Sequence, residues 1–104
     1  MSQDLPFFAI DRLAEGRFRL QGELRFDNAA AALRAALPML RQAQGRVVID
    51  LADVSRADSA GVALLIELVR AAVKRGIALR FANLPQQVEA LAAVAGITTL
   101  LPRV

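Results

Sequence analysis

The distribution of apolar and polar positions along the chain predicts an alternating series of strands and helices. Runs rich in apolar and β-branched residues predict five strands, at residues 7–13, 17–24, 47–51, 77–81 and 97–101. Glu15 and Gly16 favour a tight turn between the first two strands, so that these form a hairpin. The third strand is a β-branched run, which is typical of a strand covered on both faces, and the fourth is expected to be another buried strand.

Three segments with apolar residues at helical spacing predict helices, over residues 28–45, 59–75 and 85–96. Pro38 lies inside the first segment and predicts a kink, or the start of a short additional helix. The order of elements places a helix between each pair of later strands. The expected fold is therefore a single α/β domain over residues 1–104, with an N-terminal β-hairpin, a mixed and mostly parallel sheet, and three to four helices.

Composition narrows the classes of function. The chain contains no cysteine and no histidine, the residues that most often supply a nucleophile, a general base or a transition-metal ligand. Its formal net charge is +3, from twelve arginines spread without a run, one lysine (Lys74) and ten acidic residues. A nucleic-acid-binding protein more often has a concentrated basic stripe with exposed aromatic residues. We expect neither an enzyme nor a nucleic-acid-binding protein, and no cofactor.

The sequence also indicates where in the cell the protein is expected. Residues 1–4 do not form a basic segment leading into an apolar run, so no secretory signal is expected. The longest charge-free apolar stretch, residues 59–66, is much shorter than the ~20 residues that a membrane-spanning helix needs. We expect a cytoplasmic protein that reaches a membrane only through a partner.

Residues 50–61 are the strongest candidate site, because they join a predicted buried strand to the N-terminus of an apolar helix. Asp58 or Ser59 is expected to cap that helix, and Asp50 to order the loop. Asp50, Asp53 and Asp58 together suggest a divalent cation only weakly, because their spacing does not match a calcium-binding loop. No metal site is therefore expected.

The predicted helix at residues 59–75 is apolar on almost every side. Its expected core stripe consists of Val62, Leu65, Ile66, Val69 and Val73. The adjacent face carries Ala60, Ala63 and Leu64 before it reaches Glu67. Two interpretations stay open: this face is a surface for a partner protein, or it is a solvent-exposed face rich in alanine.

Residues 48–65 closely resemble the central motif of STAS domains, a family that includes the anti-sigma-factor antagonists. The resemblance rests on the pattern D-[ST]-x-G-x-x-x-L, which begins at Asp58. Residues 20–24 (LQGEL) resemble the second strand of the family, and residues 84–91 its last long helix. The resemblance implies the STAS fold over nearly the whole chain.

Antagonists in this family carry a phosphorylatable serine or threonine directly before the glycine, whereas this chain has Ala60 before Gly61 and a hydroxyl at Ser59. That arrangement resembles the small STAS subunit of bacterial ABC transporters that move phospholipids to maintain outer-membrane asymmetry. It implies a partner, the cytoplasmic ATPase subunit of such a transporter. The alternative partner is an anti-sigma factor or kinase, with Ser59 as the phosphorylation site. The residues expected at the partner surface are Asp58, Ser59, Ala60, Gly61, Ala63, Leu64 and Glu67.

Overall fold

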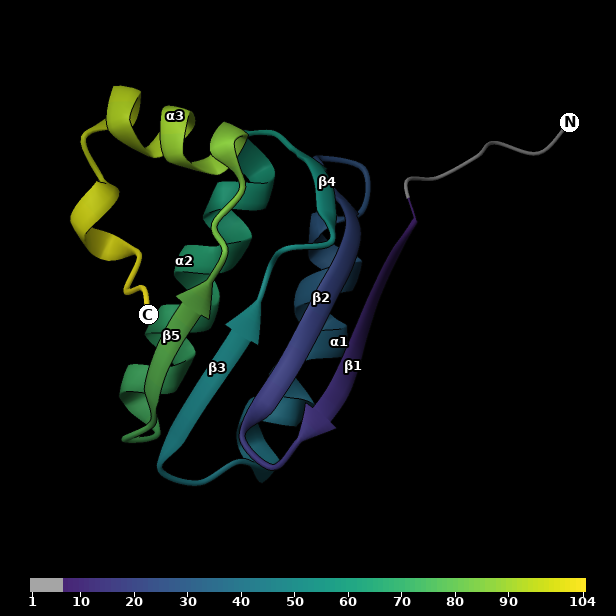
Figure 1. The fold of residues 1–104 in the computed structure, drawn as a ribbon, viewed down its shortest axis with the longest axis vertical. Coiled ribbons are helices and arrows are strands. Elements are labelled where there is room, and N and C mark those ends of the chain that lie inside the picture. Colours follow the sequence, from purple (N-terminus) through teal and green to yellow (C-terminus); the bar gives the residue numbers. More distant parts are fainter. Residues whose placement is uncertain (1–6) are drawn as a thin grey trace, which may run out of the picture.

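Residues 7–104 fold into one five-stranded sheet and three α-helices (Figure 1). A computed structural model describes residues 7–104; the N-terminal segment considered for a secretory signal, residues 1–4, lies outside the described residues. The strands are β1 (Phe8–Ala14), β2 (Arg17–Leu24), β3 (Arg46–Asp50), β4 (Val54–Ala57) and β5 (Ala78–Ala82). The helices are α1 (Ala29–Gln42), α2 (Ser59–Lys74) and α3 (Gln86–Ala95), followed by a 3₁₀ helix at Thr98–Leu100. This order confirms the predicted single α/β architecture.

The sheet is mixed, as predicted. Strands β1 and β2 form the antiparallel hairpin, and β2, β3 and β5 run parallel in the order β1-β2-β3-β5. Strand β4, which the sequence did not predict, pairs with the second half of β2, beyond the part that pairs with β3. One edge of β2 therefore holds β3 and then β4, and β4 leads directly into α2.

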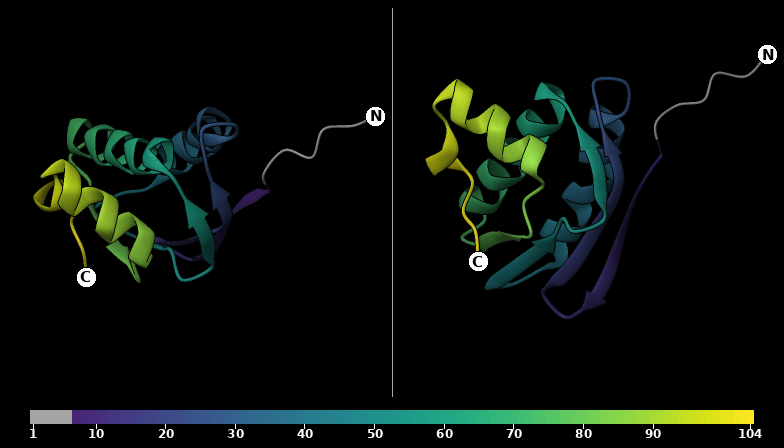
Figure 2. Two further views of the ribbon diagram at one scale, coloured as in Figure 1. Left: turned by 90° about the horizontal axis from the view of Figure 1, so that it is seen from above. Right: turned by 45° about the horizontal axis from the view of Figure 1, so that its top comes forward.

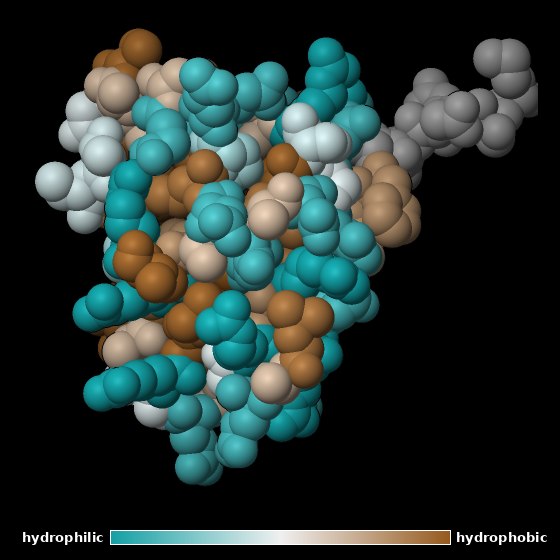
Figure 3. Space-filling model, viewed as in Figure 1, coloured by the Kyte–Doolittle hydropathy of each residue, from teal (hydrophilic) through white to brown (hydrophobic). Residues whose placement is uncertain are grey.

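All three helices lie outside the sheet, and α1 and α2 cover the same face of it (Figure 2). Burial accordingly alternates along β3 and β5, with Val47, Ile49, Leu79 and Phe81 buried and the residues between them more accessible. The prediction that β3 is covered on both faces is wrong, because only one helical layer packs on it. The opposite face of the sheet is open to solvent (Figure 3).

Two further expectations are corrected by the structure. Pro38 does not start the additional short helix that was one of its two predicted effects, because α1 runs continuously from Ala29 to Gln42. Pro38 is exposed, so water can reach the carbonyl group that the missing N–H leaves without a helical donor. Residues 97–101 form no strand, because Gly96 ends α3 in the left-handed conformation and the chain then tightens into the 3₁₀ helix.

No helix within residues 7–104 is long and apolar enough to cross a lipid bilayer.

Candidate functional site

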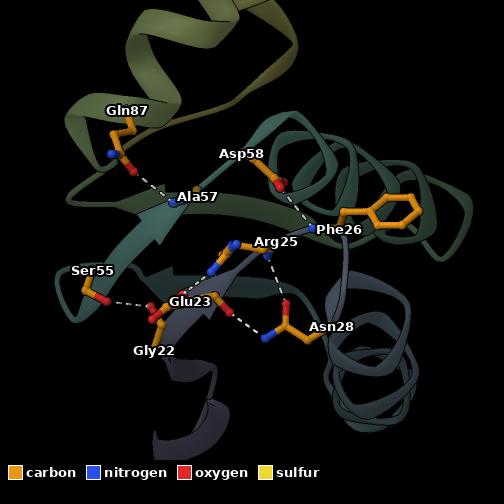
Figure 4. Close-up of polar contacts among 9 residues, drawn as sticks. All are labelled: Gly22, Glu23, Arg25, Phe26, Asn28, Ser55, Ala57, Asp58 and Gln87. Carbon is orange, nitrogen blue, oxygen red and sulfur yellow. Dashed lines mark hydrogen bonds and ion pairs between the residues drawn. The ribbon is translucent and has the colours of Figure 1, made fainter. Parts of the chain in front are cut away.

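Asp58 connects two loops at one end of the molecule. Its Oδ1 accepts hydrogen bonds from the backbone N–H groups of Ala60 (2.9 Å) and Gly61 (3.2 Å), which makes Asp58 the N-cap of α2. Its Oδ2 accepts a hydrogen bond from the backbone N–H of Phe26 (3.0 Å), in the loop between β2 and α1 (Figure 4). Of the two predicted capping residues, Asp58 is therefore the one that caps.

These hydrogen bonds also determine the charge of Asp58. Desolvation by burial would by itself raise the pKa of the carboxyl group, but the N–H donors of Phe26, Gly61 and Ala60 favour the ionised form and lower the pKa. Asp58 is therefore a fixed negative charge near neutral pH. It holds the start of α2 against the β2–α1 loop.

Gly61 allows α2 to approach the sheet closely. A Cβ atom at this position would lie 2.4 Å from the carbonyl oxygen of Leu24, at the end of β2. The same carbonyl oxygen accepts the backbone N–H of Asp58 at 3.2 Å. Gly61 is buried, so its contribution is to position the site and it does not itself face a partner.

The β2–α1 loop is held by a further set of polar contacts (Figure 4). The side chain of Asn28 accepts the backbone N–H of Arg25 (2.9 Å) and donates to the carbonyl oxygen of Glu23 (2.7 Å). Gln87, at the start of α3, accepts the backbone N–H of Ala57 at 2.9 Å. The β2–α1 loop, β4 and α3 therefore meet around the N-terminus of α2.

Ser59 is the first residue of α2, and its side chain is exposed. Among residues 7–104 its hydroxyl group has no hydrogen-bond partner. Ser59 stands at the margin of an open cavity of about 320 Å³ between α2 and α3, which we call the α2–α3 groove. The groove is lined by Ser59, Val62, Ala63, Ile66, Leu91, Val94, Ala95 and Ile97. Its lining is almost entirely apolar.

The predicted partner residues divide into two groups. Ser59, Ala63 and Glu67 are exposed and Ala60 is half-buried, so these four remain available on the surface. Glu67 makes an ion pair with Arg70 at 3.1 Å and is not part of the groove lining. Ser59 and Ala63 are the two predicted residues that line the groove.

The burial of Leu64 contradicts its predicted position on an exposed partner surface. Its side chain is only 3% exposed, whereas Val73, predicted to lie in the core, is 71% exposed. The buried stripe of α2 includes Leu64, Leu68 and Ala72, because α2 packs against α1 on one side and α3 on the other. Val62 and Leu65 of the predicted core stripe are buried as expected. The prediction is wrong for Leu64 and Val73, because it considered cover by the sheet and not by the neighbouring helices.

The second wall of the groove was also missed. Leu91, Val94 and Ile97 come from α3 and the turn after it, 32 to 38 positions beyond Ser59 in the sequence. Val94 is 89% exposed, whereas Val88 and Ala92 of the same helix are buried. In the sequence, a valine at position 94, off the buried face of the third helix, was the signal that this helix has a second apolar face.

Asp50 orders a neighbouring loop, as predicted. Its Oδ1 accepts hydrogen bonds from the side chain of Asn83 (3.0 Å) and the backbone N–H of Ala52 (2.9 Å). The hydrogen bond from Asn83, followed by that from Ala52, lowers the pKa of Asp50. Within residues 7–104, no three acidic side chains are grouped closely enough to hold a metal ion.

Comparisons with known proteins identify a family through one family model and a shared fold through solved structures. A family model described as "Mlab, STAS domain" matches residues 10–102. The anti-sigma factor antagonist SpoIIAA, in its unphosphorylated form, superposes with a TM-score of 0.70 at 16% identity, over 94% of this chain and 88% of that chain. A putative anti-sigma factor antagonist from Thermotoga maritima superposes with a TM-score of 0.73 at 15% identity, over 92% and 84% of the two chains.

A part of a much larger protein has the same fold. The murine anion transporter Slc26a9 superposes with a TM-score of 0.67 at 18% identity, over 85% of this chain and 15% of that chain. At these identities the structural likenesses establish the fold and nothing further. None of the curated proteins matches the sequence.

Proposed function

Because this chain belongs to the STAS domain family, whose members are generally regulatory or accessory and not catalytic, we propose that it is the small accessory subunit of a phospholipid ABC transporter, of the MlaB type. In this role it binds the cytoplasmic ATPase subunit, an MlaF-like protein, and supports ATP turnover. It carries out no chemistry itself. It helps to maintain outer-membrane lipid asymmetry from the cytoplasmic side of the inner membrane, to which its partner holds it.

One observation carries this proposal: an exposed, unbonded hydroxyl group at Ser59 borders an apolar groove, while Ala60, at the usual phosphoacceptor position of the family, has no hydroxyl group. Such a surface has a polar group for orientation and apolar area for affinity, the two components of a protein–protein interface. The MlaB label of the matching family model points in the same direction.

The geometry limits which residues take part in docking. Val94 and Ala63 can contact an apolar side chain of the ATPase from opposite walls of the groove, and Ser59 can hydrogen-bond at its margin. Leu64 does not contact the partner; its buried side chain holds α2 against the core. Asp58 and Gly61 set the position of Ser59 through the N-cap and the close contact with β2.

Substitution of Ser59 tests the proposal. Ser59→Ala removes the hydroxyl group and leaves the shape nearly unchanged, so a hydrogen bond buried in the complex would be lost at a cost of about 1–3 kcal/mol. We expect weaker co-purification with the ATPase subunit and lower ATP turnover. Ser55→Ala, at an exposed serine on β4, is the matched control and should leave both unchanged. If the two variants behave alike, Ser59 has no such role.

A second candidate function follows from the same free hydroxyl group. Ser59 stands at a helix N-terminus, where a phosphate of about −2 charge is favoured by roughly 0.3–1 kcal/mol. A phosphorylated Ser59 would make the chain an anti-sigma-factor antagonist controlled by a kinase. The neighbouring carboxylate of Asp58 opposes this charge. Intact-mass analysis of protein from its native cells distinguishes the two functions, since stoichiometric phosphate on Ser59 would support the antagonist.

A further inference from the structure

The end of the molecule opposite Ser59 carries a concentration of basic side chains. The β1–β2 turn, the C-termini of α1 and α2, and the starts of β3 and β5 meet there (Figure 1). Backbone contacts join these segments, since Gly16 accepts the N–H of Val48 and Gly45 accepts that of Ala78. Seven exposed basic residues, which we call the basic end, belong to these segments: Arg12, Arg17, Arg41, Arg46, Lys74, Arg75 and Arg80.

The charge of the basic end is only partly offset within the part of the chain that the structure describes, where Arg17 adds to the hydrogen bonds that lower the pKa of Asp50. None of its seven side chains forms an ion pair there, whereas Arg19, Arg25, Arg70 and Arg103 all do. Glu15, in the β1–β2 turn, is the one acidic residue among the connecting segments. Long hydrophilic side chains dominate this end in the lower part of Figure 3.

The acidic residues lie mostly elsewhere. Strand ends, loops and helix starts toward the Ser59 end contain Glu23, Asp27, Asp50, Asp53, Asp58 and Glu89, whereas Asp11 lies beside Arg12 on β1 and Glu67 lies in the middle of α2. The chain, with a net charge of only +3, is therefore strongly polarised along its length. A concentrated basic surface of this kind attracts an extended anionic partner.

Helix stability accounts for only part of the basic end. Arg41 and Lys74 lie in the last turns of α1 and α2, and Arg75 directly follows α2, where positive charge complements the helix dipole. Arg12, Arg17, Arg46 and Arg80 lie on strands, so this explanation does not apply to them. Arg17 and Arg80 each neighbour Val48 across the sheet, so their backbones are about 10 Å apart.

Two exposed aliphatic side chains accompany these charges. Leu13, near the end of β1, is 48% exposed, and Val73, in the last turn of α2, is 71% exposed. Among the described residues of the basic end, no aromatic side chain is exposed for a nucleic-acid base to stack on. Basic residues beside exposed aliphatic ones are typical of surfaces that rest on lipid headgroups.

We propose that the basic end binds the surface of an anionic phospholipid bilayer. The arginine and lysine side chains lie over headgroup phosphates, and Leu13 and Val73 reach the boundary of the acyl chains. This orientation directs the Ser59 end away from the bilayer and leaves the α2–α3 groove free for a partner. Direct contact with the bilayer departs from the expectation that the chain reaches a membrane only through a partner. The proposal shares no residue with the docking site, so it stands or fails independently of the proposed function.

Vesicle co-sedimentation with the purified chain alone tests this proposal, at ~0.1 M salt, where electrostatic attraction extends about 10 Å. One set of vesicles contains phosphatidylglycerol mixed with phosphatidylethanolamine, and the other contains only phosphatidylcholine. The test variant is Arg17→Gln/Arg46→Gln/Arg80→Gln. The control, Arg34→Gln/Arg56→Gln/Arg70→Gln, removes the same charge from exposed positions elsewhere. Thermal denaturation establishes that both variants fold.

We expect binding to the phosphatidylglycerol vesicles but not to phosphatidylcholine. A basic residue near an anionic surface raises binding about fivefold, so the test variant should bind about 100-fold more weakly and the control within a few-fold of the original chain. Equal binding to both vesicle types, no binding to either, or equal losses in the two variants would overturn the proposal. Tighter binding to a short DNA duplex than to the vesicles would assign the basic end to nucleic acid instead.

Discussion

The carboxylate of Asp58 and the backbone N–H of Phe26 form a 3.0 Å hydrogen bond across 32 positions of sequence. The other oxygen of the same carboxylate caps α2, so one side chain fixes both the helix start and the loop beside it. Phe26 itself is 82% exposed next to this contact. Hydrogen bonds therefore fix the backbone around Ser59, while the side chains of Ser59 and Phe26 remain accessible.

Asp58→Ala removes both functions of the carboxylate. Loss of the N-cap alone costs about 0.5–2 kcal/mol, and the N–H of Phe26 also loses its acceptor. We expect the free energy of unfolding to fall by about 2 kcal/mol and the melting temperature by roughly 10 °C. Asp58→Asn keeps an oxygen in the capping position and should lose clearly less. Calorimetry on the two variants measures the difference, and equal losses would argue against a capping role.

Stability should fall in acid because of Asp50 and Asp58. Both carboxyl groups have a lowered pKa in the folded chain, so their stabilising contribution is complete above the unfolded pKa of about 3.9 and is lost as the pH falls through the lower folded pKa. Urea unfolding at pH 7 and near pH 3 measures this loss. Asp50→Asn should be less stable than the original chain at pH 7, with a smaller difference near pH 3. A difference independent of pH would contradict the assignment.

Gly61→Ala should destabilise the chain although alanine is the better helix former. In an open helical position the change would stabilise by up to about 1 kcal/mol, but here the added Cβ atom would meet the carbonyl oxygen of Leu24 at 2.4 Å. We expect a net loss of about 1–3 kcal/mol in chemical denaturation. The reverse substitution at an exposed site of the same helix, Ala63→Gly, should cost about 1 kcal/mol. Stabilisation by Gly61→Ala would show that α2 does not approach β2 this closely.

The orientation of α2 is tested by a pair of apolar truncations. Leu64→Ala deletes a buried side chain and should cost about 2–5 kcal/mol, whereas Val73→Ala should change stability by less than about 0.5 kcal/mol. Urea denaturation of both variants is sufficient. The opposite ranking would restore the helix orientation that the sequence pattern suggested.

The elements of the fold could be predicted because each depends on local chemistry. Alternating apolar residues in β2, the Glu15–Gly16 turn and the glycine that ends α3 act over a few positions. The missed strand β4 is only four residues long and stays in the sheet because it lies along the free part of β2. The sequence pattern does not contain such a tertiary neighbour.

The candidate site was predictable in position but not in composition. The D-S-x-G pattern located the start of α2 and the exposed Ser59. It could not show that Leu64 is buried among helices packed beside α2, because the packing of two helices depends on their separation in space. For the same reason the contribution of Val94 to the groove appears only once α3 is placed beside α2.

The most direct test of partner docking is the affinity of the chain for the ATPase subunit when the groove is made charged. Ala63→Asp places a carboxylate on the groove wall at an exposed position, and Ala93→Asp places the same charge on α3 outside the groove lining. Desolvating the new charge at the interface would cost several kcal/mol. Isothermal titration should show at least 100-fold weaker binding for Ala63→Asp and nearly unchanged binding for Ala93→Asp. Equal affinities for both variants would contradict docking through the α2–α3 groove.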